Sequence, residues 1–445
     1  MNSPTASAAA VDYDVIVAGG GPAGCTSALL LARAGYKVVV LEKVKFPRFH
    51  IGESILPRNA TLLKEIGLWE ELQKLPHLPK YGAEFAMGDD HQSMCFTFDN
   101  GLIPGSLVFN IERAPFDQML MDQARKAGAE VREDVTVKEI LRLQDGAVEV
   151  SIGEKTLKGR ILLDCSGHST IVGRHLGTRR NFDDPELQKV AYFEHFHNVE
   201  RLPGTATGHP TIIMTKEGWF WIIGLDETKT SVGFVTHPHF TKTLNVPSDR
   251  VLEWAIARCP VVRHRMRNAT GPLKNRVLSD FSYTCSPHAG PGYFMVGDAG
   301  CFLDPIFSTG VTLAMMGATE AAKQTIGILR GEKKPAAAQG AYRKFVSGST
   351  GIFWGLIRAY YRHSFRELFM NGQGPLQVHN AIISVLAGHV FPRPPFQLRW
   401  RLWFFHMCVR MQKFVALCPR RRVCSLVETD AELPASLGAM EAAAG

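Results

Sequence analysis

The sequence lacks the features of a membrane-spanning, secreted or metal-binding protein. No apolar run approaches the roughly 18 residues that cross a bilayer, and the apolar stretch 381–390 is much shorter. The N-terminus carries neither the positive region nor the apolar region of a signal peptide, so we expect residues 1–11 to form a disordered leader and the protein to be cytoplasmic. The nine cysteines are an odd number without a CxxC pair, which predicts reduced thiols and no metal site.

Acidic residues are missing from one segment near the C-terminus. The net charge is +8, and the segment 393–422 contains eight Lys or Arg and no Asp or Glu, so the rest of the chain is balanced. This confinement argues against nucleic acid as a partner. We expect 398–422 to be a basic amphipathic helix that either touches an anionic surface, whether membrane headgroups or an acidic carrier protein, or packs its apolar stripe on the protein. That stripe comprises Trp400, Trp403, Phe404, Met407, Met411 and Phe414.

A length of 445 residues predicts two to three structural units. Residues 14–17 and 37–41 have the pattern of buried strands on either side of a glycine-rich turn and a helix, which makes a βαβ unit. Helices are expected at 57–75 and 113–128 and throughout the region after 309. Strands are expected within 81–108, 130–164 and 190–235, and the proline-rich stretch 391–395 is typical of a linker.

The glycine-rich turn has the pattern of a dinucleotide site. Gly19, Gly21 and Gly24 form GxGxxG between the first strand and its helix, and Glu42 ends the second strand. The first glycine permits the tight turn, the second lets the backbone approach a pyrophosphate, and the third lets the helix pack on the strand. The helix N-terminus then attracts the phosphates, and Glu42 can accept a hydrogen bond from a ribose hydroxyl.

Two later segments indicate which dinucleotide binds. The segment GYFMVGDAGCFLDP (292–305) resembles the GD motif of the FAD monooxygenases, which places Asp298 at the position that contacts the ribityl chain of the flavin. The segment DCSG (164–167) resembles the strand end that returns the chain to FAD. The resemblance therefore implies FAD as the cofactor. No second GxGxxG follows, so we expect reduction by a separate flavin reductase or by NAD(P)H that binds transiently.

Four further segments are similar to flavin-dependent halogenases, particularly those that act on phenolic or pyrrolic substrates. FPRFHIGESILP (46–57) resembles the stretch after their second strand, and LPKYGAEFAMG (78–88) the stretch that carries their catalytic lysine, which places Lys80 there. DPIFSTGV (304–311) resembles the flavin-side loop, where the backbone amides of Thr309 and Gly310 would face a halide. GWFWIIG (218–224) resembles the WxWxIP element that keeps substrate away from the flavin.

The resemblance implies a set of site residues and an architecture. The implied catalytic residues are Lys80, Ser308, Thr309, Trp219 and Trp221, and the implied cofactor residues are Gly19, Gly21, Gly24, Glu42, Lys43, Arg48, Ile51, Gly52, Glu53, Arg113, Asp298, Gly310 and Val311. The implied fold is α/β: a Rossmann-type FAD-binding domain of the GR2-like class with an inserted β-sheet substrate domain and a helical C-terminal region. We place the first in 12–80, 110–185 and 285–330, the second in 81–109 and 186–284, and the third, with its basic tail, in 331–445.

The implied function is that of an FAD-dependent oxidoreductase. Reduced flavin and O₂ would give a C4a-hydroperoxide that halogenates or hydroxylates an electron-rich aromatic substrate, either small and free or tethered to a carrier protein. Gly224 stands where the WxWxIP element has proline, and glycine is expected to loosen the backbone there. Two alternatives therefore stay open: a monooxygenase without halogenation, and a geranylgeranyl-reductase-like enzyme acting on an unsaturated substrate.

Some of these residues also have purely structural interpretations. Lys80 in a proline-containing loop could be a solvated surface lysine, whereas a role in trapping an oxidant would require a site dry enough to disturb its pKa. Ser308 and Thr309 could cap the helix that follows. Trp219 and Trp221 could be strand core residues, and on a strand they would share one face while Phe220 takes the other.

Overall fold

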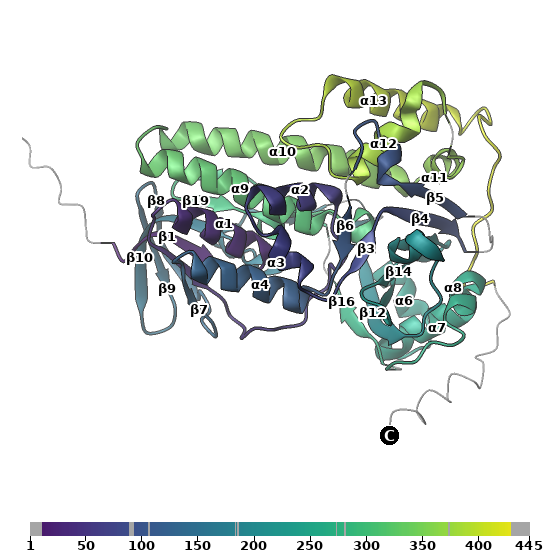
Figure 1. Ribbon diagram of the computed structural model, residues 1–445, viewed down its shortest axis with the longest axis horizontal. Coiled ribbons are helices and arrows are strands. Elements are labelled where there is room, and N and C mark those ends of the chain that lie inside the picture. The colour runs from purple at the N-terminus through teal and green to yellow at the C-terminus, as the bar shows by residue number, and fades with distance from the viewer. Residues whose placement is uncertain are drawn as a thin grey trace, which may run out of the picture.

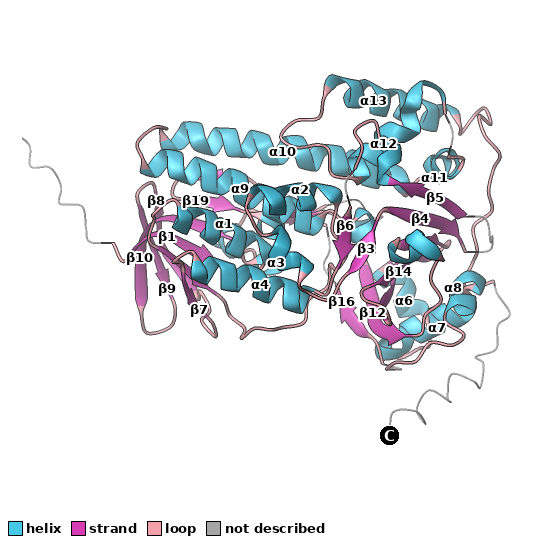
Figure 2. Cartoon of the chain, in the orientation of Figure 1, coloured by secondary structure: helices cyan, strands magenta, loops and turns pink. Residues whose placement is uncertain are grey.

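A computed structural model describes residues 11–88, 93–105, 107–182, 184, 187–272, 274–279, 282–372 and 374–428. It shows a mixed α/β protein built around two large sheets with helices on their faces (Figures 1 and 2). The α/β prediction is therefore confirmed. The leader 1–10 and the last residues of the basic tail lie outside the described residues, and the domain boundaries proposed above stay a prediction.

The first sheet is mostly parallel and starts with the predicted βαβ unit. Its order is β18-β19-β10-β1-β2-β7, and all neighbours except β18 and β19 run parallel. Its central strands are buried almost throughout, as expected for a sheet covered on both faces. The strands are β1 (Tyr13–Ala18), β2 (Val38–Leu41), β7 (Glu130–Arg132), β10 (Thr156–Asp164), β18 (Ala289–Gly290) and β19 (Tyr293–Met295), with the antiparallel hairpin β8 (Glu139–Gln144) and β9 (Ala147–Ser151) beside β10.

Helices of very different sequence position cover one face of this sheet together. The helix α1 (Pro22–Arg33) packs between α4 (Arg113–Lys126) and α9 (Gly310–Leu329), and α10 (Pro335–Tyr360) lies against α9 (Figure 1). Because α1 and α9 both begin at the carboxyl edge of the parallel strands, their N-termini face the same side of the sheet. This edge is where ligands bind in open α/β sheets.

The second sheet takes its strands from two distant segments of the chain. Its order is β16-β12-β15-β14-β13-β4-β5. One side packs on α7 (Val251–Arg258) and α8 (Pro260–Arg265), and the other side joins the main core. The strands are β4 (Gly82–Met87), β5 (Ser93–Thr97), β12 (Val190–His197), β13 (Thr211–Met214), β14 (Gly218–Gly224), β15 (Lys229–Thr236) and β16 (Arg276–Leu278).

Smaller elements connect these layers. β3 (Leu78–Lys80) pairs with β6 (Val108–Asn110), and β11 (Arg179–Asn181), β17 (Tyr283–Cys285) and β20 (Cys301–Phe302) form a short sheet. The remaining helices are α2 (Pro57–Glu65), α3 (Trp69–Gln73), α5 (Ile171–His175), α6 (Pro238–Thr243), α11 (His363–Met370), α12 (Val378–Leu386) and α13 (Phe396–Met411). Among the described helices, none is both long enough and apolar enough to cross a bilayer.

Three predicted elements are wrong in extent or character. The helix 57–75 is split into α2 and α3, because Gly67 turns the chain at φ +70°. The helix predicted at 398–422 ends at Met411. The chain then runs back to the second sheet, where the backbone of Cys424 forms an isolated β-bridge with Thr215. The stretch 391–395 is not a free linker, since the Phe391 ring packs against Phe345 of α10.

Candidate active site

A cavity of about 440 Å³ lies between the two sheets, at the carboxyl edge of the parallel strands. Its walls come from the β1–α1 turn, the segment 41–54, the start of α4, the segment 165–171, β14 and the segment 296–314. All the predicted site residues line it except Gly24 and Lys80. Within the described ranges, no group of His, Cys, Asp and Glu is arranged to hold a metal ion.

The three glycines of GxGxxG differ in what surrounds them. Gly19 has φ +107°, and a Cβ there would lie 2.3 Å from the Cys165 carbonyl oxygen. A Cβ on Gly24 would lie 1.8 Å from the Gly19 carbonyl oxygen, so this glycine permits close packing of helix on strand. A Cβ on Gly21 would meet only the Arg48 guanidinium at 3.6 Å and would otherwise project into open space. The turn thus leaves room for a phosphate group at the N-terminus of α1.

Acidic groups stand at both ends of the proposed dinucleotide cradle. Glu42 accepts from the Gly20 amide at 2.7 Å and from the Val44 amide at 3.0 Å, which fixes the carboxylate in the cavity wall. Burial raises the pKa of the Asp298 carboxyl, and no side-chain hydrogen bond occupies this carboxylate in the described part of the chain. An acceptor in this position suits the hydroxyls of a ribityl chain. The cavity therefore fits FAD by its shape and by its polar groups.

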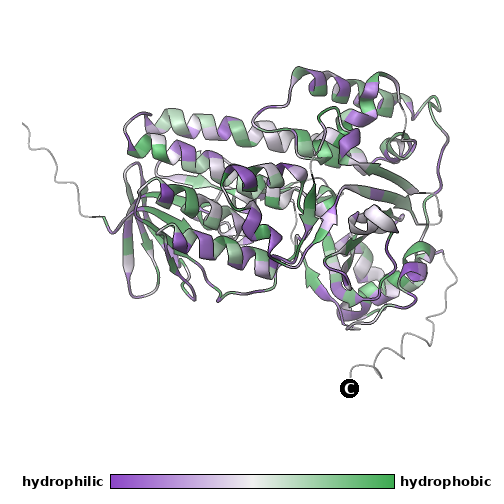
Figure 3. Ribbon diagram, in the orientation of Figure 1, coloured by the Kyte–Doolittle hydropathy of each residue, from purple (hydrophilic) through white to green (hydrophobic). Residues whose placement is uncertain are grey.

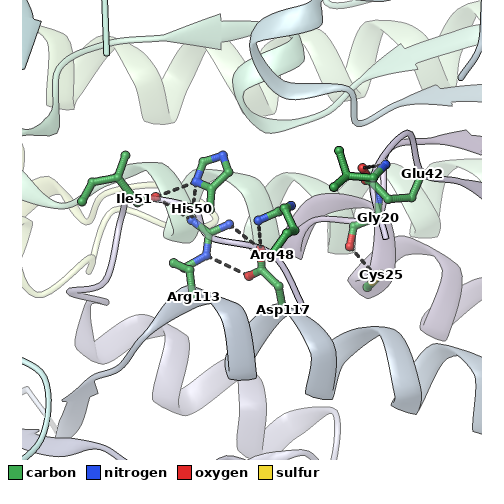
Figure 4. A network of polar contacts seen from close by, with 9 residues as sticks. Gly20, Cys25, Glu42, Arg48, His50, Ile51, Arg113 and Asp117 are labelled. Atoms are coloured by element: carbon green, nitrogen blue, oxygen red, sulfur yellow. Dashed lines mark hydrogen bonds and ion pairs between the residues drawn. The ribbon is translucent and has the colours of Figure 1, made fainter. Parts of the chain in front are cut away.

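A polar network supports the middle of the cradle (Figure 4). The Arg113 guanidinium donates twice to the Asp117 carboxylate, at 2.8 and 2.9 Å, and Arg48 pairs with the same carboxylate at 3.0 Å. Arg113 also donates to the Ile51 carbonyl at 3.0 Å. Burial and the positive charge of Arg113 lower the pKa of His50 to about 3, so the His50 ring is neutral. The network leaves a net positive charge beside the phosphate end of the cavity.

Lys80 is buried, and the interpretation as a solvated surface lysine is wrong. β3 pairs with β6 and carries Lys80 into the interior, where its side chain is 2% exposed. The Nζ donates to Ser54 Oγ at 2.8 Å and to the Ile55 carbonyl at 3.0 Å, and among the described residues no carboxylate pairs with it. Burial lowers the pKa of Lys80 to about 7, as the proposed oxidant-trapping role requires. Ser54 lines the cavity, so the amine lies one hydrogen bond behind the wall.

This pKa predicts a stability effect with a defined sign. The folded-state pKa of about 7 lies below the ordinary value of 10.5, so the unfolded chain binds more protons between these values and stability rises with pH across that window. Below pH 7 the full cost of the buried ammonium, about 5 kcal/mol, is present. Lys80→Met is therefore expected to raise the free energy of unfolding most at pH 6.5 and progressively less towards pH 10. Denaturant unfolding of both proteins at several pH values measures the difference, and a difference independent of pH would contradict the prediction.

The tryptophan-rich strand forms the wall opposite the glycines. Trp219 and Trp221 line the cavity with ring centroids 6.0 Å apart, whereas Phe220 packs in the core on the other side of the sheet. The predicted alternation of faces is confirmed. The expectation of a loose backbone at Gly224 is wrong, because Gly224 pairs with Thr230 in the hairpin and the Arg201 side chain fills the space beside it.

The start of α9 closes the cavity between the flavin motifs and the tryptophans. Ser308 adopts a left-handed conformation with φ +55°, and Thr309 follows as the N-cap residue without a side-chain capping bond. The purely capping interpretation of these two side chains is therefore wrong. The first amides of α9 have no partner within the helix, and Thr309, Gly310 and Val311 line the cavity. A helix N-terminus of this kind favours an anion.

Comparison with known proteins agrees with this geometry. A family model described as FAD binding domain matches residues 12–342. A 1H-pyrrole-2-carbonyl-[peptidyl-carrier protein] chlorinase of Pseudomonas fluorescens is 30% identical over 79% of this chain and 84% of its own. The chain belongs to the flavin-dependent halogenase family. The protein is therefore an FAD-dependent oxidoreductase enzyme, and its cofactor is FAD.

Other similar proteins have names that specify a different halide, another halogenase or another flavoprotein. A 1H-pyrrole-2-carbonyl-[peptidyl-carrier protein] brominase of Pseudoalteromonas luteoviolacea is 32% identical over 78% of this chain and 86% of its own. Among solved structures, the myxobacterial chondrochloren halogenase superposes with a TM-score of 0.73 at 28% identity, covering 89% of this chain and 97% of its own. A flavoprotein/dehydrogenase from Cytophaga hutchinsonii superposes with a TM-score of 0.80 at 26% identity, covering 90% and 99%.

The halogenase fold brings together residues that sequence reasoning missed. The Trp219 indole donates to the Tyr361 hydroxyl at 3.0 Å, and that hydroxyl donates to the Asp304 carboxylate at 2.8 Å. Asp304 also accepts from the Ile306 amide at 2.9 Å and begins the loop that leads to Thr309. Tyr361 thus links β14, which carries Trp219, to the loop that runs from Asp304 to Thr309. No local motif surrounds Tyr361 at the end of α10, so only its long-range contacts reveal it.

Tyr361→Phe is expected to lower the free energy of unfolding by about 1–3 kcal/mol, because it leaves the buried Asp304 and Trp219 groups without their shared partner. The same change should lower the share of reduced flavin that yields product, since the cavity wall and the loop lose their link. Tyr360→Phe is the matched control, because Tyr360 is buried beside it and its hydroxyl makes no hydrogen bond among the described residues. Equal stability losses in the two variants, measured by urea unfolding, would contradict a role for the hydrogen bonds from Trp219 through Tyr361 to Asp304.

Glu53 has a side-chain partner, His195, that the sequence did not reveal. Its Oε1 lies 2.6 Å from Nε2 of His195 on β12, while Oε2 is buried without a hydrogen-bond partner among the described residues. Burial by itself lowers the pKa of His195, but the hydrogen bond and the charge of Glu53 raise it above its ordinary value. Glu53 therefore ties the cofactor segment to the second sheet, and the free oxygen leaves one acceptor at the cavity wall.

Proposed function

We propose that the protein halogenates an electron-rich aromatic ring of the phenol or pyrrole class. The observation that carries the proposal is the buried amine of Lys80. It has a pKa of about 7, has no carboxylate partner in the part of the chain that the structure describes, and lies directly behind the cavity wall. A hydroxylase whose substrate meets the flavin directly has no use for such a group, whereas a halogenase needs one to direct an electrophilic halogen species. The well-packed strand at Gly224 also removes the argument for an open path to the flavin.

Each group of residues has a defined task in this proposal. Bound FAD, once reduced, supplies the O₂ chemistry that oxidises the halide. The N-terminus of α1, with Gly21 and Arg48, holds the pyrophosphate, and Asp298 accepts from the ribityl chain. The amides of Thr309 and Gly310 bind the halide at the start of α9. Trp219 and Trp221 form an apolar wall that keeps the substrate ring away from the flavin end of the cavity.

Lys80 acts after the halide has been oxidised. Near neutral pH Lys80 is the free amine in a large fraction of the molecules. This amine either accepts a hydrogen bond from hypohalous acid or takes the halogen from it with release of water. To do so it exchanges its hydrogen bond with Ser54 for one to the oxidant. The amine then presents the halogen to the aromatic ring. As the carbon–halogen bond forms, the bond from the halogen to nitrogen or oxygen breaks, and the ring proton passes to the released amine or to the released hydroxide, which leaves as water.

The substrate is delivered on a carrier protein in this proposal. This proposal is supported by two similar proteins whose names specify pyrrole-2-carbonyl groups on peptidyl-carrier proteins. The cavity wall on the substrate side is apolar and aromatic, which suits a flat ring without charge. We further propose that a separate flavin reductase supplies the reduced cofactor.

Mass spectrometry of the product tests the proposal. The holoenzyme is supplied with reduced FAD, O₂ and either chloride or bromide, and with free or carrier-tethered pyrrole-2-carboxylate and phenolic acids. We expect a halogenated product that depends on the halide and is formed faster from the tethered substrate. An oxygenated product at saturating halide would overturn halogenation, and equal rates for free and tethered substrate would overturn carrier delivery alone.

A further inference from the structure

The helix α13 presents an apolar face to solvent in addition to the face that it packs. Leu398, Phe405 and Val409 are buried against α11, α12 and the core. The predicted stripe lies partly in solvent: Trp403 is 67% exposed and Phe414, just beyond the helix end, is 86% exposed. Trp400, Phe404 and Met407 are half-buried, and Phe404 packs against the core. The expectation that this stripe packs on the protein therefore holds only for its half-buried part. Phe396, Met411, Val415 and Leu417 extend the same exposed surface.

Positive charge surrounds these exposed apolar side chains. Arg399, Arg410 and Lys413 are exposed along α13 and just after its end. Arg420 and Arg422 are exposed in the segment that leads from α13 back to the second sheet. The whole segment 371–427 contains no Asp or Glu. Among the described residues, neither a hydrogen bond nor an ion pair ties Arg399, Arg410 or Lys413 to an acidic group. Figure 3 shows the resulting alternation of hydrophobic and hydrophilic bands along α13.

We infer that this surface, formed by α13 and the segment 412–422, docks the enzyme on an anionic lipid bilayer. Exposed Trp and Phe side chains beside Lys and Arg are the combination that inserts at the boundary between headgroups and acyl chains. The apolar side chains would enter this boundary while the cations pair with lipid phosphates. The inference is independent of the halogenation proposal, because it uses no residue of the cavity.

A substrate-bearing carrier protein fits this surface less well. None of the residues that line the cavity belongs to the segment 371–427, and Figure 1 shows α13 at the outer edge of the molecule, beyond α12 as seen from β4 and β5 of the second sheet. A carrier docked there would contact none of the residues that line the cavity its substrate must reach. A bilayer, by contrast, needs only an exposed convex surface with aromatic and basic side chains.

Vesicle flotation of the full-length holoenzyme tests the inference. We expect binding to vesicles that contain 30% phosphatidylglycerol in phosphatidylcholine and little binding to phosphatidylcholine alone, with a loss at high salt that reflects the charge contribution. Arg410→Glu with Lys413→Glu should weaken binding at least about tenfold, and Trp403→Ser with Phe414→Ser should do the same at any salt concentration. The matched controls are Lys155→Glu with Lys158→Glu, and Leu141→Ser, which alter exposed residues of the β9–β10 turn, β10 and β8.

Folding and alternative occupants are settled in the same experiment. Flavin content and the thermal unfolding midpoint establish that each variant is folded, as expected for exposed positions. Quenching of Trp403 fluorescence by brominated lipid, taken as the difference between wild type and Trp403→Phe, reports insertion directly. Binding that the control variants lose equally would overturn the inference. So would an absence of quenching, capture only by an acidic carrier protein, or a self-association in sedimentation analysis that Trp403→Ser abolishes.

Discussion

Replacing Lys80 with methionine is expected to abolish the halogenated product while the oxidation of reduced FAD and the release of hydrogen peroxide continue. Methionine fills the buried space but cannot accept a hydrogen bond from an oxidant or carry a halogen. Because the amine acts after the halide has been oxidised, the loss should fall on product alone. Loss of a positioned catalytic group of this kind typically costs about 100- to 10,000-fold. The measurement is product mass spectrometry together with peroxide quantification on the same reactions.

Two further variants make this result specific to the Lys80 amine. Lys74→Met alters an exposed lysine of the neighbouring helical segment, which pairs only with Glu71, and it should leave the product yield unchanged. Lys80→Arg keeps the charge but stays protonated at every accessible pH, so it should be as inactive as Lys80→Met. Retention of the halogenated product in Lys80→Met would refute the role of the amine, and a product that carries oxygen instead would favour the hydroxylase alternative.

Replacing Gly21 with valine is expected to give a folded protein without FAD. Gly21 has φ −74° in an extended conformation that any residue can adopt, and a Cβ there meets only Arg48 at 3.6 Å. The backbone therefore tolerates the substitution, and the added methyl groups occupy the space that the pyrophosphate needs. We expect the affinity for FAD to fall at least about 100-fold, which corresponds to about 2.8 kcal/mol. Absorbance of the purified protein and titration with FAD measure it.

Two other glycines provide the contrast that this experiment needs. Gly351→Val, on the exposed face of α10 where no atom lies within 4 Å, should keep a full complement of flavin. Gly24→Val should instead fail to fold, because even a Cβ would lie 1.8 Å from the Gly19 carbonyl oxygen. A stoichiometric flavin spectrum in Gly21→Val would show that the pyrophosphate lies elsewhere.

Residues in short motifs were predictable because their surroundings are local. The turn at Gly19 and the start of α1 form from adjacent residues, and the strand of residues 13–18 needs only its own apolar run to be recognised. Asp298, Thr309 and Gly310 were instead assigned because their short segments resemble flavoenzyme motifs, and they lie where a strand or loop meets a helix. The alternation of Trp219, Phe220 and Trp221 follows from the two-residue period of a strand. These features established the fold class, the cofactor and most of the cavity wall.

The tertiary structure alone decided the features that depend on which face of an element meets which neighbour. The pKa of Lys80 falls to about 7 because β3 pairs with β6 and Ser54 covers the amine, whereas the sequence around Lys80 allows a surface loop equally well. Tyr361 reaches Trp219 across 142 residues of chain, a contact that no periodicity encodes. α13 carries two apolar stripes, and helical spacing cannot tell which one is packed; burial of Leu398 and Phe405 chose one and left Trp403 in solvent. Local pattern specifies what an element can present, and packing specifies what it does present.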